Sequence, residues 1–253
     1  MAFVTDPTFY LLAIPAVLLT GISKGGFASG AGNLLVPLMA LSVPAPVAAG
    51  IALPLLCAMD VSGVKAWWGQ WDTREMRVLV PGALAGILAG SFAFGFLSNR
   101  AILAMVGLTT LLFLARALWL ATRRSVPPPA PHDPLKGGIC AAASGFTSTI
   151  AHAGSPPLAI YLYPRRLDRQ VMAATTVVFF GVMNYVKLIP YFFLGNLSAG
   201  NLATSAVLLP LAPVGVYLGI WLQKRVPDVL FYRMLYALLA VTGVKLTWDG
   251  IFG

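Results

Sequence analysis

The sequence carries little charge for its length. Of its 253 residues, 10% are Asp, Glu, Lys or Arg and 58% are hydrophobic, which is more apolar surface than one soluble core would bury. The charges gather in short clusters between apolar stretches of roughly 20 residues, the length of a helix that crosses a hydrocarbon core of about 30 Å. Strand-period alternation is absent, which argues against a barrel. The sequence therefore predicts an all-α polytopic membrane protein embedded in the lipid bilayer.

Cysteine and histidine are also scarce. Cys57 and Cys140 lie in apolar stretches without a partner pattern, so we expect buried free thiols. The two histidines, His132 and His152, are well separated, and Asp60 is the one acidic residue deep in an apolar stretch. These residues supply neither a metal cluster nor a paired nucleophile and base, so we expect no enzyme, no metal and no cofactor.

Signals for nucleotides and nucleic acids are missing as well. No Gly-x-x-x-x-Gly-Lys-Ser/Thr motif is present, so nothing indicates ATP as an energy source. The net charge of +9 comes from short loop clusters rather than from one continuous basic stripe. We therefore expect no nucleic-acid partner and interpret the basic clusters as topology signals.

What the sequence does contain is an interrupted apolar segment that occurs twice. Residues 9–41 are broken by small and polar residues at 23–33, and residues 136–164 are broken by a similar run at 144–157. In a membrane protein, paired interruptions at matching places in two halves indicate a transport site. Three uninterrupted apolar runs follow each interrupted segment: 46–68, 75–97 and 101–121, then 170–193, 201–223 and 230–251.

These features predict two halves of similar layout. We expect a first membrane repeat at 1–121, a Pro-rich cytoplasmic linker at 122–135 and a second membrane repeat at 136–253. Each repeat would contain one re-entrant or broken helical hairpin and three transmembrane helices. Lysine and arginine in short loops favour the cytoplasm. Four basic clusters are therefore expected inside: 74–77, 123–124, 165–169 and 224–225.

This orientation places both ends of the segment 136–164 in the cytoplasm. Limbs of roughly 13 to 15 residues would reach about 20 Å, short of a full crossing, so a re-entrant hairpin fits best. If the segment 9–41 does the same from the opposite side, the halves have inverted topology and both termini lie outside. The two hairpin tips would then meet near the middle of the membrane. The sequence leaves open whether each hairpin re-enters or crosses fully.

The hairpin tips are the candidate anion site. Irregular backbone at membrane depth must be buried in protein or line a polar cavity, and helix N-termini offer free N–H donors to anions. We expect Asn33 and Ser155 to cap the returning limbs, with Pro156 at the first helical position. The candidate substrate-binding residues are small, polar or basic and lie at or near the tips: Lys24, Gly25, Gly26, Ser29, Gly32, Asn33, Ser148, Thr149, His152, Gly154, Ser155, Asn184 and Lys187.

Ionisable residues in apolar stretches are further candidates because their insertion into a membrane is costly. Asp60, Lys65 and Tyr185 are candidates for coupling or gating, and Asp60 can equally be a structural partner of Lys24 or Lys65. His152 can bind an anion when protonated, carry a coupling proton, or pack as a neutral ring. Aromatic residues near the span ends are expected in interfacial belts: Trp67, Trp68, Trp71, Tyr191, Trp221 and Trp248.

The repeated segment resembles the TauE/SafE family of membrane anion transporters, often described as sulfite exporters. The resemblance rests on the glycine-rich run from Gly25 to Pro37 and on a shorter second copy, Ala151 to Leu158, followed by 173–176. It implies secondary transport of sulfite, organosulfonates or similar small anions, usually outward across the bacterial inner membrane. The residues that match the repeated motif are the tip residues named above.

We therefore expect a secondary transporter that exports a small anion by alternating access, with a proton or sodium ion as the coupling partner. An anion channel would use the same donors and is the alternative. A membrane assembly factor would instead bind a protein partner without moving solute. Faces of small residues would allow a homodimer, but they can equally pack inside the chain.

Overall fold

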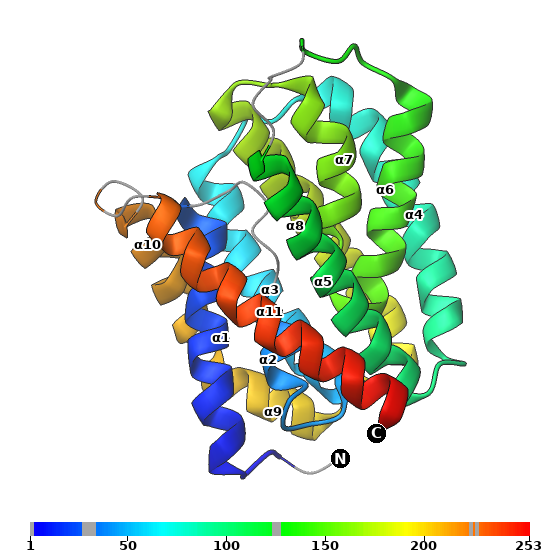
Figure 1. Cartoon of the computed structure of the whole chain (residues 1–253), viewed down its shortest axis with the longest axis vertical. Coiled ribbons are helices and arrows are strands. Elements are labelled where there is room, and N and C mark those ends of the chain that lie inside the picture. Colours follow the sequence, from blue (N-terminus) through cyan, green and yellow to red (C-terminus); the bar gives the residue numbers. More distant parts are fainter. Residues whose placement is uncertain (1–2, 27–33, 123–127, 223–224, 226–227) are drawn as a thin grey trace.

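In the part of the chain that the structure describes, all regular secondary structure is helical. The computed structural model describes residues 3–26, 34–122, 128–222, 225 and 228–253. No strand occurs within these ranges, and the helices lie side by side in an elongated bundle (Figure 1). In chain order they are α1 (Pro7–Gly26), α2 (Leu35–Met39), α3 (Ala45–Ala66), α4 (Thr73–Phe94), α5 (Asn99–Thr122), α6 (Pro134–Ala151), α7 (Ser155–Arg165), α8 (Arg169–Phe193), α9 (Ala199–Leu208), α10 (Leu211–Leu222) and α11 (Asp228–Phe252).

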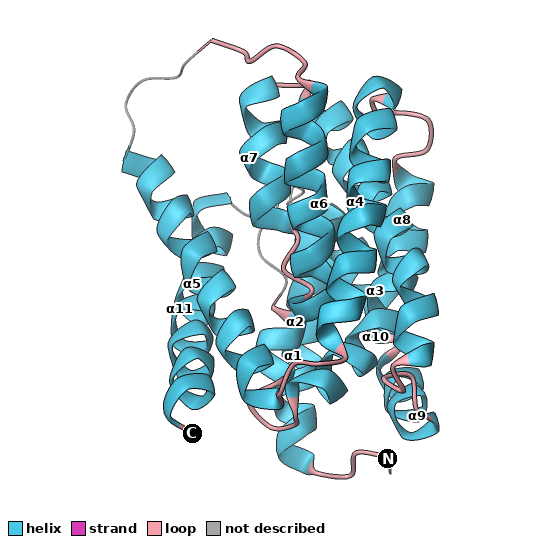
Figure 2. Ribbon diagram, turned by 90° about the vertical axis from the view of Figure 1, so that its right-hand side faces the viewer, coloured by secondary structure: helices cyan, strands magenta, loops and turns pink. Residues whose placement is uncertain are grey.

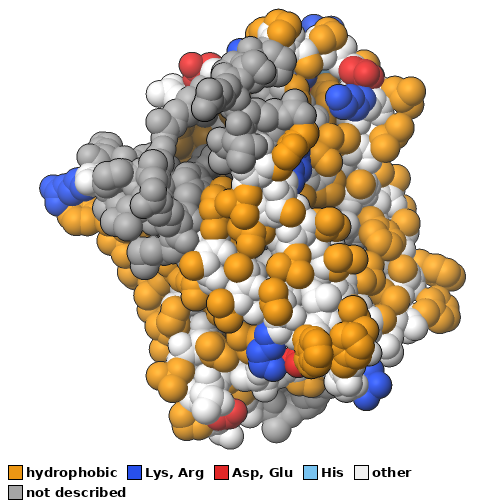
Figure 3. Space-filling view, viewed as in Figure 1, with side chains coloured by type: hydrophobic (Ala, Val, Ile, Leu, Met, Phe, Trp, Pro, Cys, Tyr) orange, Lys and Arg blue, Asp and Glu red, His pale blue; other side chains and the backbone are white. Residues whose placement is uncertain are grey.

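Several of these helices have the length and composition of membrane spans. The predicted run at 201–223 is divided into α9 and α10 near Pro210, which has no N–H group to continue a helix. The face drawn in Figure 3 is predominantly hydrophobic, with most of its charged side chains toward the two ends. The protein is therefore a multi-pass membrane protein. Six stretches of the described residues are long and apolar enough to cross a bilayer: Pro7–Gly25, Ala45–Ala66, Thr73–Phe94, Asn99–Trp119, Gln170–Phe193 and Ala199–Leu222.

The second interrupted segment forms a hairpin that returns to the end of the bundle from which it starts. The backbone N–H of Ala130, just before α6, donates to the carbonyl oxygen of Pro164 near the end of α7, at 2.8 Å. α6 has 18 residues and α7 has 11, so the limbs measure about 27 Å and about 16 Å. The expected hairpin is present, but the prediction of equal limbs was wrong.

The two limbs of the first interrupted segment differ even more in length. α1 has 20 residues, whereas α2 has five, all buried. The N–H of Val4 donates to Thr204 Oγ1 at 3.2 Å, and Ser205 Oγ donates to the carbonyl of Ile51 at 2.9 Å. α9 therefore contacts the chain just before α1 as well as α3, so this segment also begins and ends at one end of the bundle. Both chain termini lie toward that end (Figures 1 and 2). Which end faces the cytoplasm stays a prediction.

Glycines bring helices from the two predicted repeats into close contact. A Cβ atom on Gly82 would lie 2.5 Å from the carbonyl oxygen of Gly138, and one on Gly86 would overlap the carbonyl oxygen of Ala142. This register makes α4 and α6 parallel neighbours, with small residues at the interface as is common in membrane bundles. α1 and α10 approach in the same way at Gly21, where a Cβ atom would lie 2.8 Å from the Cα of Gly215. The division into repeats itself stays a prediction.

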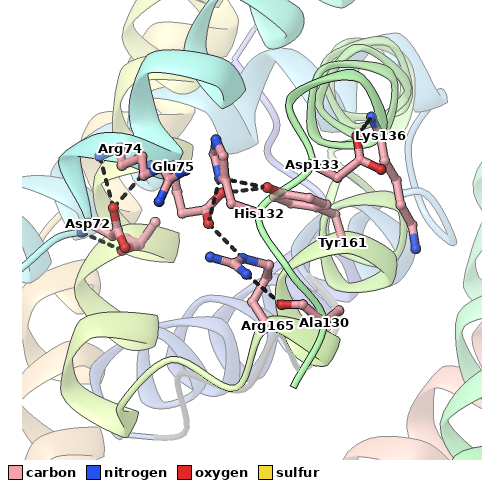
Figure 4. Close-up of polar contacts among 10 residues, drawn as sticks. Asp72, Arg74, Glu75, Ala130, His132, Asp133, Lys136, Tyr161 and Arg165 are labelled. Atoms are coloured by element: carbon pink, nitrogen blue, oxygen red, sulfur yellow. Dashed lines mark hydrogen bonds and ion pairs between the residues drawn. The ribbon is translucent and has the colours of Figure 1, made fainter. Parts of the chain in front are cut away.

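A buried carboxylate ties the linker to the bundle (Figure 4). Glu75, in the first turn of α4, accepts hydrogen bonds from Tyr161 Oη at 2.7 Å and from Arg165 Nε at 2.7 Å. His132 Nδ1 lies 3.1 Å from the same carboxylate, and Arg165 also donates to the carbonyl of Ala130. The predicted linker is therefore held against α4 and α7 by its last residues rather than lying free. His132 serves this contact and is distant in sequence from the hairpin tips.

We expect the substitution Gly86→Ala to destabilise the protein by about 1–3 kcal/mol, because the added methyl group forces α4 and α6 apart. Gly138→Ala is the matched control, since a Cβ atom there meets nothing within 4 Å. Thermal unfolding of the purified protein in detergent measures both. Equal losses of stability in the two variants would contradict the proposed close packing at Gly86.

Candidate functional site

The first cluster of predicted site residues joins three helices. Lys24, in the last turn of α1, forms an ion pair with Asp60 of α3, and Asn184 Nδ2 of α8 donates to the other oxygen of Asp60 at 2.6 Å. Asp60 and Asn184 are 2% and 3% exposed. The partner of Asp60 is therefore Lys24 and not Lys65, which is exposed. The charge of Lys24 is compensated within the protein.

The second cluster is built around Lys187 of α8, which is completely buried. Its Nζ atom donates to Ser148 Oγ at 2.9 Å and to the Ser148 carbonyl oxygen at 3.2 Å, and it lies 3.1 Å from His152 Nδ1. Among the described residues, no carboxylate lies within 4.0 Å of this nitrogen. The negative end of the α6 dipole faces the ammonium group, but it carries only about half an elementary charge. A full positive charge here is only partly compensated.

His152 holds the tip of the hairpin in shape. Its φ of 50° lies in the left-handed region, which ends α6 and turns the chain toward α7. Because a lysine ammonium can only donate, Nδ1 of His152 is the acceptor in their contact. Nε2 lies 3.3 Å from the carbonyl oxygen of Ala49 and therefore donates to it. The hydrogen bonds thus fit a neutral ring with its proton on Nε2.

α8 presents these contacts from a single face. Asn184, Lys187 and Tyr191 follow the spacing i, i+3, i+7, which places side chains along one stripe of a helix. Tyr191 is completely buried, and its hydroxyl donates to the carbonyl oxygen of Thr149 at 2.6 Å. The prediction of an interfacial role for Tyr191 was therefore wrong. The signal that would have found it is its spacing of four residues from Lys187.

The turn between α6 and α7 differs from the sequence prediction. Ser155 is the first residue of α7, and Gly154 occupies the capping position without a side-chain hydrogen bond. A Cβ atom on Gly154 would lie 2.8 Å from the Ser144 carbonyl oxygen, and Ser144 Oγ donates to the Gly154 carbonyl at 2.7 Å. The chain passes so close to α6 that glycine takes the cap, so the prediction of a Ser155 cap was wrong. Pro156 lies in the first turn of α7, at the second helical position rather than at the first, where it was predicted.

The returning limb of the first segment offers no comparable helix terminus. α2 has only five residues and is preceded by Leu34 at its N-cap. A helix this short has little dipole, so two matching helix N-termini do not converge on the site. Ser29, Gly32 and Asn33 lie outside the described residues. The described donors that could meet an anion come from the second hairpin and from α8.

The family model described as Sulfite exporter TauE/SafE matches residues 13–246. The chain belongs to the TauE/SafE family. No curated protein and no solved structure gives a significant match. The family is one of membrane exporters of sulfite and related anions, and the matched range contains both lysine clusters.

Other residues predicted from the sequence have local roles. A Cβ atom on Gly25 would overlap the carbonyl oxygen of Val216, so Gly25 allows α1 to approach α10, and Gly26 ends α1. Thr149 Oγ1 donates to the Gly145 carbonyl at 2.8 Å within its own helix. Tyr185 and Lys65 are exposed and line a groove between α3 and α8. The structure therefore brings together Lys24, Asp60 and Asn184, and separately Ser148, Thr149, His152 and Lys187.

The two clusters should respond differently to substitution. We expect Lys187→Met to retain the native melting temperature within a few degrees, because an apolar side chain of similar length removes a buried charge. Asp60→Ala should instead destabilise the protein by about 3 kcal/mol, since it leaves Lys24 without its counter-ion. Thermal unfolding in detergent compares the two. A loss in Lys187→Met as large as that in Asp60→Ala would make Lys187 a structural residue.

Proposed function

We propose that this protein is a secondary transporter that exports a small anion, such as sulfite or an organosulfonate, across the bacterial inner membrane. The observation that carries the proposal is the completely buried amino group of Lys187, whose close partners are all neutral. A buried cation without a counter-ion favours an anionic ligand, because the ligand supplies the missing charge. Membership of the TauE/SafE family supports sulfur-containing anions as the substrate class.

Anion binding at this place would exchange a neutral acceptor for a charged one. Lys187 already donates to Ser148 and His152, so an entering oxyanion would take one of these positions on Nζ. The freed Ser148 hydroxyl can rotate to donate to the anion, since a hydroxyl is both donor and acceptor. Charge-assisted hydrogen bonds of this kind are about twice as strong as neutral ones. Movement of one half against the other around this site would give alternating access.

Asp60 is the candidate for coupling. It is held by Lys24 and Asn184, and Asn184 lies one helical turn before Lys187 on α8. A proton on Asp60 would neutralise the carboxylate and free Lys24, whereas a sodium ion would have to displace the lysine. A proton is therefore the coupling ion that the geometry favours. Movement of Asn184 with α8 would connect the protonation of Asp60 to the anion site.

Flux measurements in proteoliposomes test the transport function. The native protein should move sulfite or an organosulfonate with saturable kinetics and should exchange one anion for another. Lys187→Met should reduce this flux roughly 10- to 100-fold, because the variant cannot make the charged hydrogen bond to the anion. The free energy of one such bond corresponds to a factor of this size. Lys245→Gln is the matched control, since Lys245 pairs with Asp249 on the surface, and it should retain native flux.

Each other outcome of this experiment is informative. Native flux in Lys187→Met would contradict the anion site at the second hairpin. Flux that does not saturate and shows no exchange would make the protein a channel. Absence of flux for every anion tested, under proton and sodium gradients, would contradict the transporter function.

Substitution of Asp60 tests the coupling step separately. Asp60→Asn keeps an acceptor near Lys24 but cannot take up a proton. We expect this variant to retain anion exchange between equal concentrations on both sides and to lose accumulation driven by a pH gradient. Accumulation at the native level in Asp60→Asn would exclude Asp60 as the proton site.

A further inference from the structure

A groove opens between α3 and α8 on the outer surface of the bundle. It has a volume of about 700 Å³, which lies in the range of ligand sites, and half of the residues that line it are valines, including Val61, Val64, Val178 and Val182. Val61 is 56% exposed, so the groove is open outward rather than enclosed. Both helices contain candidate membrane spans. The groove therefore faces the hydrocarbon region of the bilayer, where the molecules available to fill it are lipids.

The groove runs from the membrane surface toward the interior. α3 and α8 are antiparallel here, since Gly63 is next to Val177 and Tyr185 Oη lies 3.5 Å from the Cys57 carbonyl oxygen. The end of the groove at Trp68 lies just beyond the last residue of α3. This is the end of the bundle that holds the basic clusters 74–77 and 165–169. Its surface end therefore lies at the depth of lipid headgroups.

A free positive charge lies at that end. Lys65 is exposed and, among the residues that the structure describes, makes no hydrogen bond or ion pair. Trp68 beside it is 72% exposed, as expected for a ring at the level of the headgroups. A lysine on a flexible stem next to such a ring can reach a lipid phosphate. The apolar wall thus complements an acyl chain, and Lys65 complements a negatively charged headgroup.

We propose that this groove binds an anionic phospholipid, with one acyl chain along the valine wall and the headgroup at Lys65. The chain would lie over Asp60, which lines the floor of the groove and is 2% exposed. Gly181 has no side chain over Asp60, and a Cβ atom at Gly181 would lie 3.6 Å from the Cβ of Asp60. The acyl chain would therefore cover the Lys24–Asp60 pair on this side of the bundle. The site goes beyond anion transport and does not depend on it.

Native mass spectrometry of the purified protein tests the proposal directly. The probes are phosphatidylglycerol and phosphatidylcholine with identical acyl chains, which differ in the net charge of the headgroup. We expect one phosphatidylglycerol per chain, bound about fivefold more tightly than phosphatidylcholine, because one lysine near the surface contributes about 1 kcal/mol. Lys65→Gln should remove this preference, and the control Lys245→Gln should retain it. Val61→Trp, at an exposed position, should fill the groove and weaken binding of both lipids.

Three outcomes would overturn the proposal. Equal binding of the two lipids to the native protein would exclude headgroup selection, and an unchanged preference in Lys65→Gln would place the site elsewhere. A dimer mass that carries no lipid and disappears in Val61→Trp would make the groove a contact between two copies of this chain. Each readout is independent of anion flux, so failure of the transport proposal would be seen separately.

Discussion

The tip of the α6–α7 hairpin depends on one constraint: peptide groups at membrane depth find no hydrogen-bond partner in lipid. The last carbonyl groups of α6 have no partner within the helix, as at every helix C-terminus. Lys187 donates to the Ser148 carbonyl, which also accepts the backbone N–H of His152, and Tyr191 donates to the Thr149 carbonyl. Tyr191 of α8 thus satisfies a carbonyl group at the end of α6, Lys187 adds a second donor to one that His152 already satisfies, and α8 supports the polar tip inside the bundle.

The same arrangement creates an asymmetry between the two hairpins. Lys24 at the first tip has a carboxylate partner in Asp60, whereas Lys187 at the second has only neutral acceptors and the partial charge of a helix end. The charge of Lys24 is compensated within the protein, whereas a charge on Lys187 is only partly compensated, and this difference is the basis of the proposed anion site. α8 contacts both clusters, through Asn184 and Lys187, which lie one turn apart. A shift of this helix would therefore move a side chain in each cluster at the same time.

Close packing sets the positions of these groups. α4 approaches α6 through Gly82 and Gly86, and this contact fixes the helix that carries Ser148 and His152. At the other end of α6, Glu75 holds the chain before α6 and the end of α7 through His132 and Arg165. The hairpin is therefore supported along its length by α4 and at its tip by α8. A site that must hold an ammonium at hydrogen-bonding distance benefits from such support on both sides.

The sequence by itself determined the class of the protein, its membrane-spanning runs and the two interrupted segments. These properties depend on hydrophobic length and on local breaks at glycine and proline, which can be read over about 20 residues. It also indicated Lys187, Ser148, Thr149 and His152 as candidate site residues, because polar groups inside apolar runs are costly; their role in transport stays a prediction. Only the tertiary structure decided that Asp60 pairs with Lys24, that Tyr191 is buried, and that Gly154 rather than Ser155 caps α7. Each of these contacts depends on which segment, distant in the sequence, packs alongside the residue. A local sequence pattern carries no information about that neighbour.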